Sequence, residues 1–301
     1  MGQAIGVLAA EHIAVGLVED NKIVGPIRTL PENLNDSNYL LELPAEEIVE
    51  AMRREIELVR ADNNVTAVGI GFPGIIRKGV IEDSPNLHQI KGHDLGTALS
   101  FLLSQSGVAT SAHVLNDADA FAAGIAATKG HLDKLIRVWT LGTGVGYGRY
   151  PQADGIWEGG HTVVTMDPKE KFCQCGGRGH LEGIMGHRAM RLRFLDLEPN
   201  EIFEEALNGD KRCSDFVKLW HQALAAATAT AIHQDGPGRF FISGHNARYI
   251  DTELLELYVR EMVRMSPLQG SSFEIVPVEH DLGIIGAAVS AALAAQASSP
   301  A

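Results

Sequence analysis

Residues 136–150 read IRVWTLGTGVGYGRY, and residues 5–18 read IGVLAAEHIAVGLV. In each stretch two apolar runs flank a short break, which predicts two neighbouring strands joined by a turn. The turns fall at Ala9–His12 in the first stretch and between Ile136–Leu141 and Val145–Tyr150 in the second. Because both halves of the chain open with the same unit, the sequence is consistent with an internal duplication.

The rest of the chain alternates apolar runs with helical patterns, the rhythm of an α/β protein. From Pro44 to about Arg60, for example, Ile48, Met52, Ile56 and Val59 fall on one helical face. Further helices are expected near Leu95–Ser104, Ala118–Lys129, Glu182–Leu195, Ser214–Ala231, Thr252–Val263 and Leu282–Ala294, with strands at Val65–Phe72, His113–Leu115, Arg239–Ile242 and Phe273–Val278.

The composition of the 301 residues limits the class of protein. A hydrophobic fraction of 45% supports one or two domains with cores of their own. The sequence has no run of about 18 apolar residues and no signal-peptide pattern, so we expect a cytoplasmic protein without a membrane partner. The net charge of −13 argues against nucleic acid as a partner, and three cysteines are too few for a disulfide framework. A role in binding a small molecule is therefore expected.

Residue types that bind metals gather in one glycine-rich part of the sequence. The segment Cys173-Gln-Cys175-Gly-Gly-Arg-Gly-His180 follows Glu158-Gly-Gly-His161. Tetrahedral Zn²⁺ accepts any mixture of four Cys and His ligands, so His161, Cys173, Cys175 and His180 are a candidate structural zinc site. The alternative is that both cysteines are small hydrophobic residues and both histidines lie in solvated loops.

This segment, together with Leu181-Glu182 after it, resembles the zinc motif of the ROK family (repressor, open reading frame, kinase), which includes bacterial glucokinases, fructokinases and N-acetylhexosamine kinases. The family usually has a third cysteine where this chain has His180. The resemblance implies an α/β protein with a duplicated ribonuclease-H-like fold of the actin/hexokinase type, in which two domains enclose an interdomain cleft.

We expect a smaller N-terminal domain of residues 1–115 plus 286–301 and a larger C-terminal domain of residues 116–285 with the zinc knuckle. The chain has no Pro- or Ser-rich linker, so a hinge is expected near Leu115–Ala118. A homodimer or homotetramer is expected as the assembly.

The run Asn116-Asp117-Ala118-Asp119-Ala120 stands where a predicted strand ends and a helix begins, the edge at which α/β sheets bind ligands. One explanation is an N-cap, because Asn or Asp commonly opens a helix. Two such residues followed by Asp119 exceed what a cap needs, and the run resembles the family's E-N-D-A-N-A-A. The resemblance implies that Asn116 and Asp117 bind sugar hydroxyls and that Asp117 is the general base of phosphoryl transfer. It also implies three further sugar-binding residues, Glu158, His161 and Glu182.

Two segments upstream resemble the family's sequences beside the sugar. Gly69-x-Gly71-x-Pro73-Gly74 matches G-x-G-x-P-G, and Asn86-Leu87 matches the start of N-L-P-G-W-x-G-x-x-L. His88-Gln89-Ile90 replace Pro-Gly-Trp. Taken singly, each segment could be an ordinary turn or loop.

Leu141-Gly-Thr-Gly-Val-Gly146 matches the family's second phosphate loop, L-G-T-G-I-G. Glycine backbone N–H groups and a threonine hydroxyl suit phosphate oxygens, although a glycine-rich hairpin turn is the alternative. The resemblance implies Mg-ATP as the nucleotide, held by Gly142, Thr143, Gly144, Gly146 and, in the altered segment Ser243-Gly244-His245, by Gly244.

The family's first phosphate loop is missing from the sequence. Where the family has D-x-G-G-T-K, this chain has a stretch through Leu8–His12 that is one residue shorter and lacks the aspartate and the glycine pair. Ala9 and Ala10 carry Cβ atoms where the backbone must approach phosphate, and Glu11 would repel phosphate unless magnesium intervened.

Two functions therefore compete. The first is ATP-dependent phosphorylation of a hexose or amino sugar with Asp117 as general base. The second is a sugar-binding regulator or pseudokinase of the same fold without phosphoryl transfer. The retained aspartate favours the kinase, because a sensor has no need of a general base.

Overall fold

A computed structural model describes residues 2–10, 12–33, 39–84, 87–106, 111–152, 158–277 and 280–298. The chain divides into two compact units, each of which is described by itself. Unit 1 consists of residues 1–136, 148–156 and 279–301, and unit 2 consists of residues 137–147 and 157–278. Each unit has a main β-sheet with helices packed on it, which confirms the predicted two-domain α/β class.

The main sheet of unit 1 has five strands in the order β3-β2-β1-β4-β7. β1 (Gln3–Ala9), β2 (Ile13–Glu19) and β3 (Lys22–Leu30) form an antiparallel meander. β4 (Val65–Phe72) pairs parallel with β1 and with β7 (Ala112–Asn116). The central strands β1 and β4 are buried on both faces, so the sheet needs helices on both sides. A separate hairpin consists of β5 (Ile75–Arg77) and β6 (Val80–Asp83).

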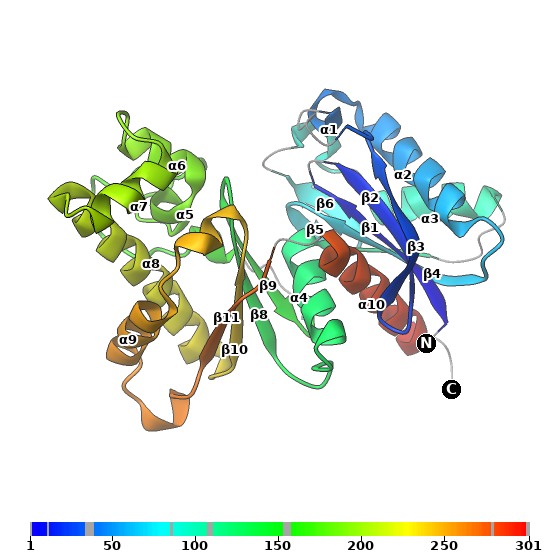
Figure 1. The fold of residues 1–301 in the computed structure, drawn as a ribbon. Coiled ribbons are helices and arrows are strands. Elements are labelled where there is room, and N and C mark those ends of the chain that lie inside the picture. Colours follow the sequence, from blue (N-terminus) through cyan, green and yellow to red (C-terminus); the bar gives the residue numbers. More distant parts are fainter. Residues whose placement is uncertain are drawn as a thin grey trace. The chain divides into compact units, whose positions relative to one another are not determined.

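One face of this sheet is covered by α10 (His280–Ser298), which packs against α4 (Asp117–Thr128), as Figure 1 shows. Gly6 and Gly69 are register partners on β1 and β4. A Cβ atom on Gly6 would lie 1.9 Å from Ile284 O, and one on Gly69 would lie 1.9 Å from Ala287 O. Because these two positions have no side chain, the backbone of α10 lies directly on the two strands.

The opposite face is covered by α2 (Ala45–Arg60) and α3 (Leu95–Gln105). Of the apolar stripe predicted for α2, Ile48, Met52 and Ile56 are fully inaccessible, and Val59 is partly buried. Asp94 caps α3 by accepting a hydrogen bond from Thr97 N at 2.9 Å. The short elements α1 (Tyr39–Glu42) and η1 (His88–Ile90) also belong to unit 1.

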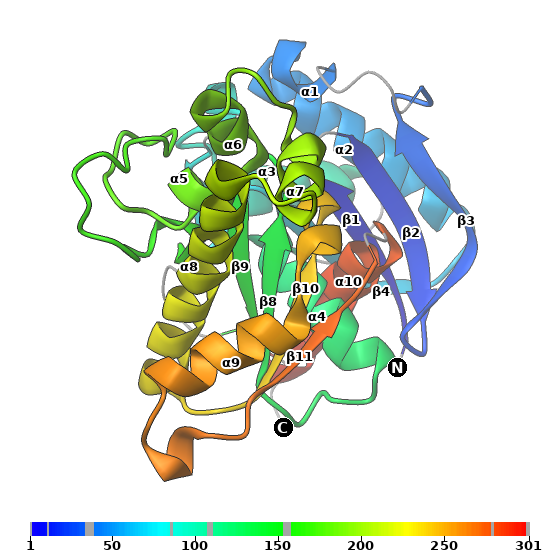
Figure 2. The same cartoon turned by 60° about the vertical axis from the view of Figure 1, so that its left-hand side comes forward.

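The second sheet has the strand order β11-β10-β8-β9, built from β8 (Ile136–Leu141), β9 (Val145–Tyr150), β10 (Arg239–Ser243) and β11 (Ser272–Ile275). Figure 2 shows α8 (Lys211–Asp235) and α9 (Thr252–Met262) beside this sheet. Trp139 of β8, Trp220 of α8 and Phe240 of β10 are fully buried in the shared core. The remaining elements of unit 2 are η2 (Gly159–His161), α5 (Glu182–Met185), α6 (His187–Arg193), α7 (Pro199–Leu207), η3 (His245–Tyr249) and η4 (Ser266–Leu268).

The boundaries between the units differ from those predicted from the sequence. The prediction placed them at 115/116 and 285/286, whereas the main crossings fall at 136/137 and 278/279, with residues 148–156 returning to unit 1. The physical reason is that α4 packs against β4 and against α10, so both helices belong to unit 1. Unit 1, expected to be the smaller, therefore holds the greater part of the chain.

Several elements also differ from the sequence prediction. The helix expected over Glu182–Leu195 is interrupted at Gly186, whose φ of −64° and ψ of 141° are extended. The strand expected over Phe273–Val278 ends at Ile275. The prediction omitted β3, β5, β6, α1 and α7. Within the described ranges, no helix combines the length and the apolar character that crossing a bilayer requires.

Candidate functional site

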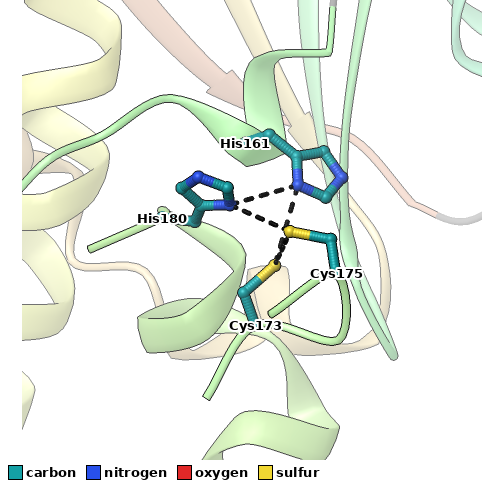
Figure 3. A group of neighbouring side chains, drawn as sticks. All are labelled: His161, Cys173, Cys175 and His180. Carbon is teal, nitrogen blue, oxygen red and sulfur yellow. Dashed lines mark hydrogen bonds between the residues drawn. The ribbon is translucent and has the colours of Figure 1, made fainter. Parts of the chain in front are cut away.

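Four side chains of unit 2 point toward one another, as Figure 3 shows: His161 at the end of η2, Cys173 and Cys175 in the following loop, and His180 just before α5. The two Sγ atoms are 3.3 Å apart, and so are the two Nδ1 atoms. Cys175 Sγ lies 3.2 Å from His180 Nδ1, and Cys173 Sγ lies 3.7 Å from His161 Nδ1. With metal–sulfur bonds of about 2.3 Å and metal–nitrogen bonds of about 2.0 Å, ligand atoms of a tetrahedron stand about 3.3–3.8 Å apart. The four residues therefore have the donor set and the spacing of a tetrahedral metal site.

The loop that carries these ligands is shaped by its glycines and by a backbone bridge. Val163 and His180 form an isolated β-bridge, which closes the loop. A Cβ atom on Gly177 would lie 2.0 Å from the Cε1 atom of His180, so only glycine leaves room for the imidazole. Gly179 has a φ of +67°, a left-handed conformation that favours glycine. The glycine-rich sequence thus makes the close approach of the ligands sterically feasible.

The protonation of two ligands responds to their surroundings. Burial raises the pKa of the Cys173 thiol well above its ordinary value, and the neighbouring Glu182 carboxylate raises it further. Burial lowers the pKa of His180, and the adjacent His161 lowers it further. Metal-free chain at neutral pH therefore has a Cys173 thiol and a neutral His180. Binding of a divalent cation would release the thiol proton, so metal affinity would rise with pH.

Glu182 connects the cluster of two cysteines and two histidines with the predicted phosphate loop. Its Oε1 accepts a hydrogen bond from Cys173 Sγ at 3.3 Å, and its Oε2 accepts one from Val145 N at 3.2 Å. Glu158, the other glutamate predicted to bind sugar, has Oε2 3.9 Å from His161 Nε2. The structure thus brings Glu158, His161 and Glu182 together around the cluster of two cysteines and two histidines.

The predicted phosphate loop lies between β8 and β9. The carbonyl oxygens of Gly142 and Thr143 accept hydrogen bonds from His187 N at 2.9 Å and Arg188 N at 3.4 Å, at the start of α6. Apart from its two chain neighbours, no atom of the described residues lies within 4 Å of a Cβ position on Gly142, and Thr143 is exposed, so the tip of the loop is open. Gly146 belongs to β9 and not to the loop itself.

Residues distant in sequence support this loop. Gly244 has a φ of +100°, and a Cβ atom there would lie 2.2 Å from the carbonyl oxygen of Leu141, the residue before the loop. Asn246, which the sequence analysis missed, is buried and donates from Nδ2 to Gly142 O at 3.2 Å. The signal in the sequence is an asparagine two residues after Gly244, which directly follows β10.

In unit 1, Asn116 ends β7 and caps α4. Its Oδ1 accepts hydrogen bonds from Ala118 N at 2.8 Å and Asp119 N at 3.3 Å, so the capping role considered from the sequence is present. Its Nδ2 donates to Gly74 O at 3.0 Å, which ties the Pro73-Gly74 turn to this strand end. Asp119 is buried and accepts from Arg149 N at 2.8 Å, so it has a structural role.

Asp117 is the first residue of α4 and is half-buried. Its Oδ1 accepts a hydrogen bond from Ala118 N at 2.9 Å. Asn116 and Asp117 thus lie together in unit 1, while the other predicted site residues lie in unit 2. Asn86, part of a motif expected beside the sugar, lies outside the described residues.

The β1–β2 hairpin closes tightly where the first phosphate loop was sought. The ladder continues to the pair Ala9 and Ile13, and Ala10 N donates to His12 O at 3.2 Å. Ala9 is fully buried. Glu11 lies outside the described residues. The described part of this turn therefore offers no glycine-lined phosphate cradle.

The chain is similar to known proteins over nearly its whole length. The sequence model of the ROK family matches residues 21–294. A glucokinase from Thermotoga maritima is 31% identical over 322 residues, which cover 94% of this chain and 95% of that protein.

Solved structures share the fold. A ROK hexokinase from Thermus thermophilus has a TM-score of 0.79 at 21% identity, covering 98% of this chain and 99% of its own. A ROK family glucokinase from Streptomyces griseus, solved in complex with glucose and AMPPNP, has a TM-score of 0.64 at 23% identity, covering 97% of this chain and 100% of its own.

Proposed function

The chain belongs to the ROK family, and from that membership we propose that it is a sugar kinase, which transfers the γ-phosphoryl group of ATP to a hydroxyl of a hexose or an amino sugar. The observation that carries this proposal is the 31% identity to a glucokinase across 94% of the chain. Glucose and AMPPNP, an ATP analogue, in the Streptomyces griseus structure support a sugar and ATP as the two substrates.

In this proposal Asp117 is the general base. It opens a helix of 12 residues, and the positive end of the helix dipole favours an ionised carboxylate, which is the form that accepts a proton. Because phosphoryl transfer has a loose transition state, the base acts mainly by orienting the attacking hydroxyl. Asn116 Nδ2 has two protons and gives one to Gly74 O, so the other is available to a sugar hydroxyl.

Glu158 and Glu182 are the proposed hydrogen-bond acceptors for the sugar hydroxyls, and His161 is the third proposed sugar-binding residue. Carboxylate oxygens accept from hydroxyl donors, and two fixed carboxylates discriminate between stereoisomers. The metal of the cluster is assigned as zinc, since two thiolates and two imidazoles at tetrahedral spacing suit that ion. Bound zinc would supply a rigid cross-link for the loop that carries His161 and leads into Glu182. The phosphates of ATP are assigned to Gly142, Thr143, Gly144, Gly146 and Gly244.

One observation favours a second function, a sugar-binding regulator or pseudokinase. The described part of the β1–β2 hairpin is paired as far as Ala9 and Ile13, and Ala9 and Ala10 stand where close approach to phosphate needs glycine. In that case the sugar site is kept and phosphoryl transfer is lost.

A coupled ADP-release assay beside sugar titration calorimetry separates the two functions. For a kinase, Asp117→Asn retains sugar binding and lowers turnover by about 10²-fold or more, the scale of a lost general base. For a regulator, wild type releases no ADP with any hexose or amino sugar, and Asp117→Asn weakens sugar binding because an acceptor is lost. Robust turnover in the Asp117→Asn variant would refute the assignment of Asp117 as general base. Absence of sugar-dependent ADP release in wild type would refute the proposed kinase activity.

A further inference from the structure

A largely buried ion pair lies beside the loop that carries the predicted metal ligands. Arg193, the last residue of α6, donates from Nη1 to Glu170 Oε1 at 2.9 Å and from Nη2 to Glu170 Oε2. The two side chains are only 18% and 8% exposed. The Arg193 guanidinium also lies 4.4 Å from the ring centre of Phe172 and 5.3 Å from that of Phe216. A planar group held by two parallel hydrogen bonds and two aromatic rings has little freedom to move.

Arg193 joins the two ends of the segment 170–183, which carries three of the four predicted metal ligands. Glu170 lies three residues before Cys173, and Gly183 lies three residues after His180. Besides Glu170, Arg193 Nη2 contacts Gly183 O at 3.4 Å. A Cβ atom on Gly183 would lie 2.9 Å from Cys173 N, so this end of the segment touches the first ligand. One side chain therefore closes a loop that contains three of the four ligands.

The helix that carries Arg193 also supports the phosphate loop. At its other end, His187 N and Arg188 N donate to the carbonyl oxygens of Gly142 and Thr143. Glu182 lies inside the closed segment, next to Gly183, and its Oε2 accepts a hydrogen bond from Val145 N at 3.2 Å. A shift of the segment against α6 would therefore move Glu182 relative to this loop.

We propose that Arg193 is a positioning residue: with Glu170 it fixes the spacing of Cys173, Cys175 and His180 for their metal ion and holds Glu182 in place. The consequence for Glu182 rests on the sugar kinase proposed above, whereas the consequence for the metal does not. The nearest comparison on the same helix is Arg191, whose ion pair with Glu198 is exposed on both sides. Exposed ion pairs of that kind contribute little to folding stability.

The first test measures zinc release from purified wild type, Arg193→Lys and Arg191→Lys into excess chromogenic chelator. Lysine keeps the charge but not the two-pronged geometry, so Arg193→Lys is expected to release zinc about tenfold faster or more, the scale seen for residues that orient metal ligands. Arg191→Lys is expected to match wild type. Equal release from the two variants, or wild type that binds no zinc, would overturn the proposal.

A second variant covers the case in which Arg193→Lys folds poorly, because an ammonium group cannot reproduce both hydrogen bonds to the buried Glu170 carboxylate. The double variant Glu170→Leu/Arg193→Met replaces the pair with apolar groups that fill the same space. It is expected to fold and still release zinc about tenfold faster than wild type. Release at the wild-type rate would show that the pair only fills space and would overturn the proposal.

The role toward Glu182 is read from steady-state kinetics. Arg193→Lys is expected to raise the sugar KM about tenfold while kcat stays near that of wild type, because Glu182 binds the sugar and does not take part in the transfer. A fall in kcat at unchanged sugar KM would overturn this role. If wild type shows no turnover, the proposed kinase fails, and the zinc-release comparison still decides the positioning of the metal ligands.

Discussion

Replacing Gly69 with alanine is expected to lift α10 off the sheet of unit 1. The new Cβ atom would lie 1.9 Å from Ala287 O and 2.4 Å from Ala287 C, whereas real Cβ contacts stay above 3.0 Å. The obstructing atoms are helix backbone and cannot rotate away. The strand and the helix must therefore separate by more than about 1 Å, because close-packed interiors yield little.

The cost follows from what α10 buries against this face. Ile284, Ile285, Ala288 and Val289 are all 5% exposed or less. A gap of about 1 Å already forfeits up to half of each van der Waals contact across the interface. Overpacking strain alone costs typically about 1–3 kcal/mol. With the lost contacts added, we expect Gly69→Ala to cost about 3 kcal/mol or more, which lowers the Tm by about 6–12 °C.

Gly16→Ala is the matched control. Gly16 is the register partner of Gly6 on β2, and its nearest neighbours are side-chain carbons, Ile284 Cγ2 at 3.1 Å and Ile23 Cδ1 at 3.2 Å. These methyl groups can shift by a few tenths of an ångström, so a change of less than about 1 kcal/mol is expected. Thermal and urea unfolding followed by circular dichroism measure both variants. If Gly69→Ala were no more destabilising than Gly16→Ala, direct contact between the α10 backbone and β4 would be refuted.

Three further predictions concern the metal, the pH dependence and the hairpin. Cys175→Ser is expected to abolish zinc retention, measured by metal analysis, and to lower stability and sugar affinity together; unchanged sugar binding after metal loss would separate the cluster from the sugar site. Burial lowers the pKa of His221, whose Nε2 accepts a hydrogen bond from Asp251 N at 3.0 Å. The contribution of neutral His221 to folding stability is therefore complete above about pH 6.5, the ordinary histidine pKa, and is lost as the pH falls through the lower pKa of the folded state. Urea midpoints should therefore fall less between pH 7.5 and 5 in His221→Gln than in wild type, and identical pH profiles would contradict this. Rebuilding Leu8–His12 as an Asp-x-Gly-Gly-Thr-Lys loop, one residue longer, is expected to restore or raise sugar-dependent ADP release; a rebuilt chain that folds but gains no nucleotide binding would count against a phosphate role for this turn.

The elements that the sequence predicted well have one clear period and a buried face. β4 is almost entirely apolar, and α2 carries a continuous stripe, so both were predicted within a residue. β3 was missed because it is an edge strand with mostly exposed residues and Gly25-Pro26 in its middle, which reads as a turn. α7 was missed although its start carries two signals, a proline at the first helical position and a capping box between Glu198 and Glu201.

In the candidate site, too, features with a local sequence pattern were predicted, and features that depend on distant contacts were not. The four predicted metal ligands lie within residues 161–180, so their spacing in the sequence was enough to group His161, Cys173, Cys175 and His180. The break at Gly186 has a tertiary cause, because the next two backbone N–H groups, of His187 and Arg188, donate to the carbonyl oxygens of Gly142 and Thr143 and not to the preceding helical turn. Contacts of this kind leave no local pattern. The cytoplasmic location and the homodimer or homotetramer stay predictions.

The order of the elements along the chain also determines when each unit can fold during synthesis. β1 and β4 emerge from the ribosome early, but the helix that covers one face of them, α10, starts only at residue 280, after all of unit 2 has been made. At about 5–20 residues per second, the stretch from β7 to α10 takes about 10–30 s to translate. During this interval the face of β1 and β4 that α10 covers in the folded chain has only α4 against it, whereas unit 2 has its complete sequence once residue 278 has been made. We therefore expect protease resistance on stalled ribosomes to appear first in unit 2, and the unit that begins the chain to be the last to fold.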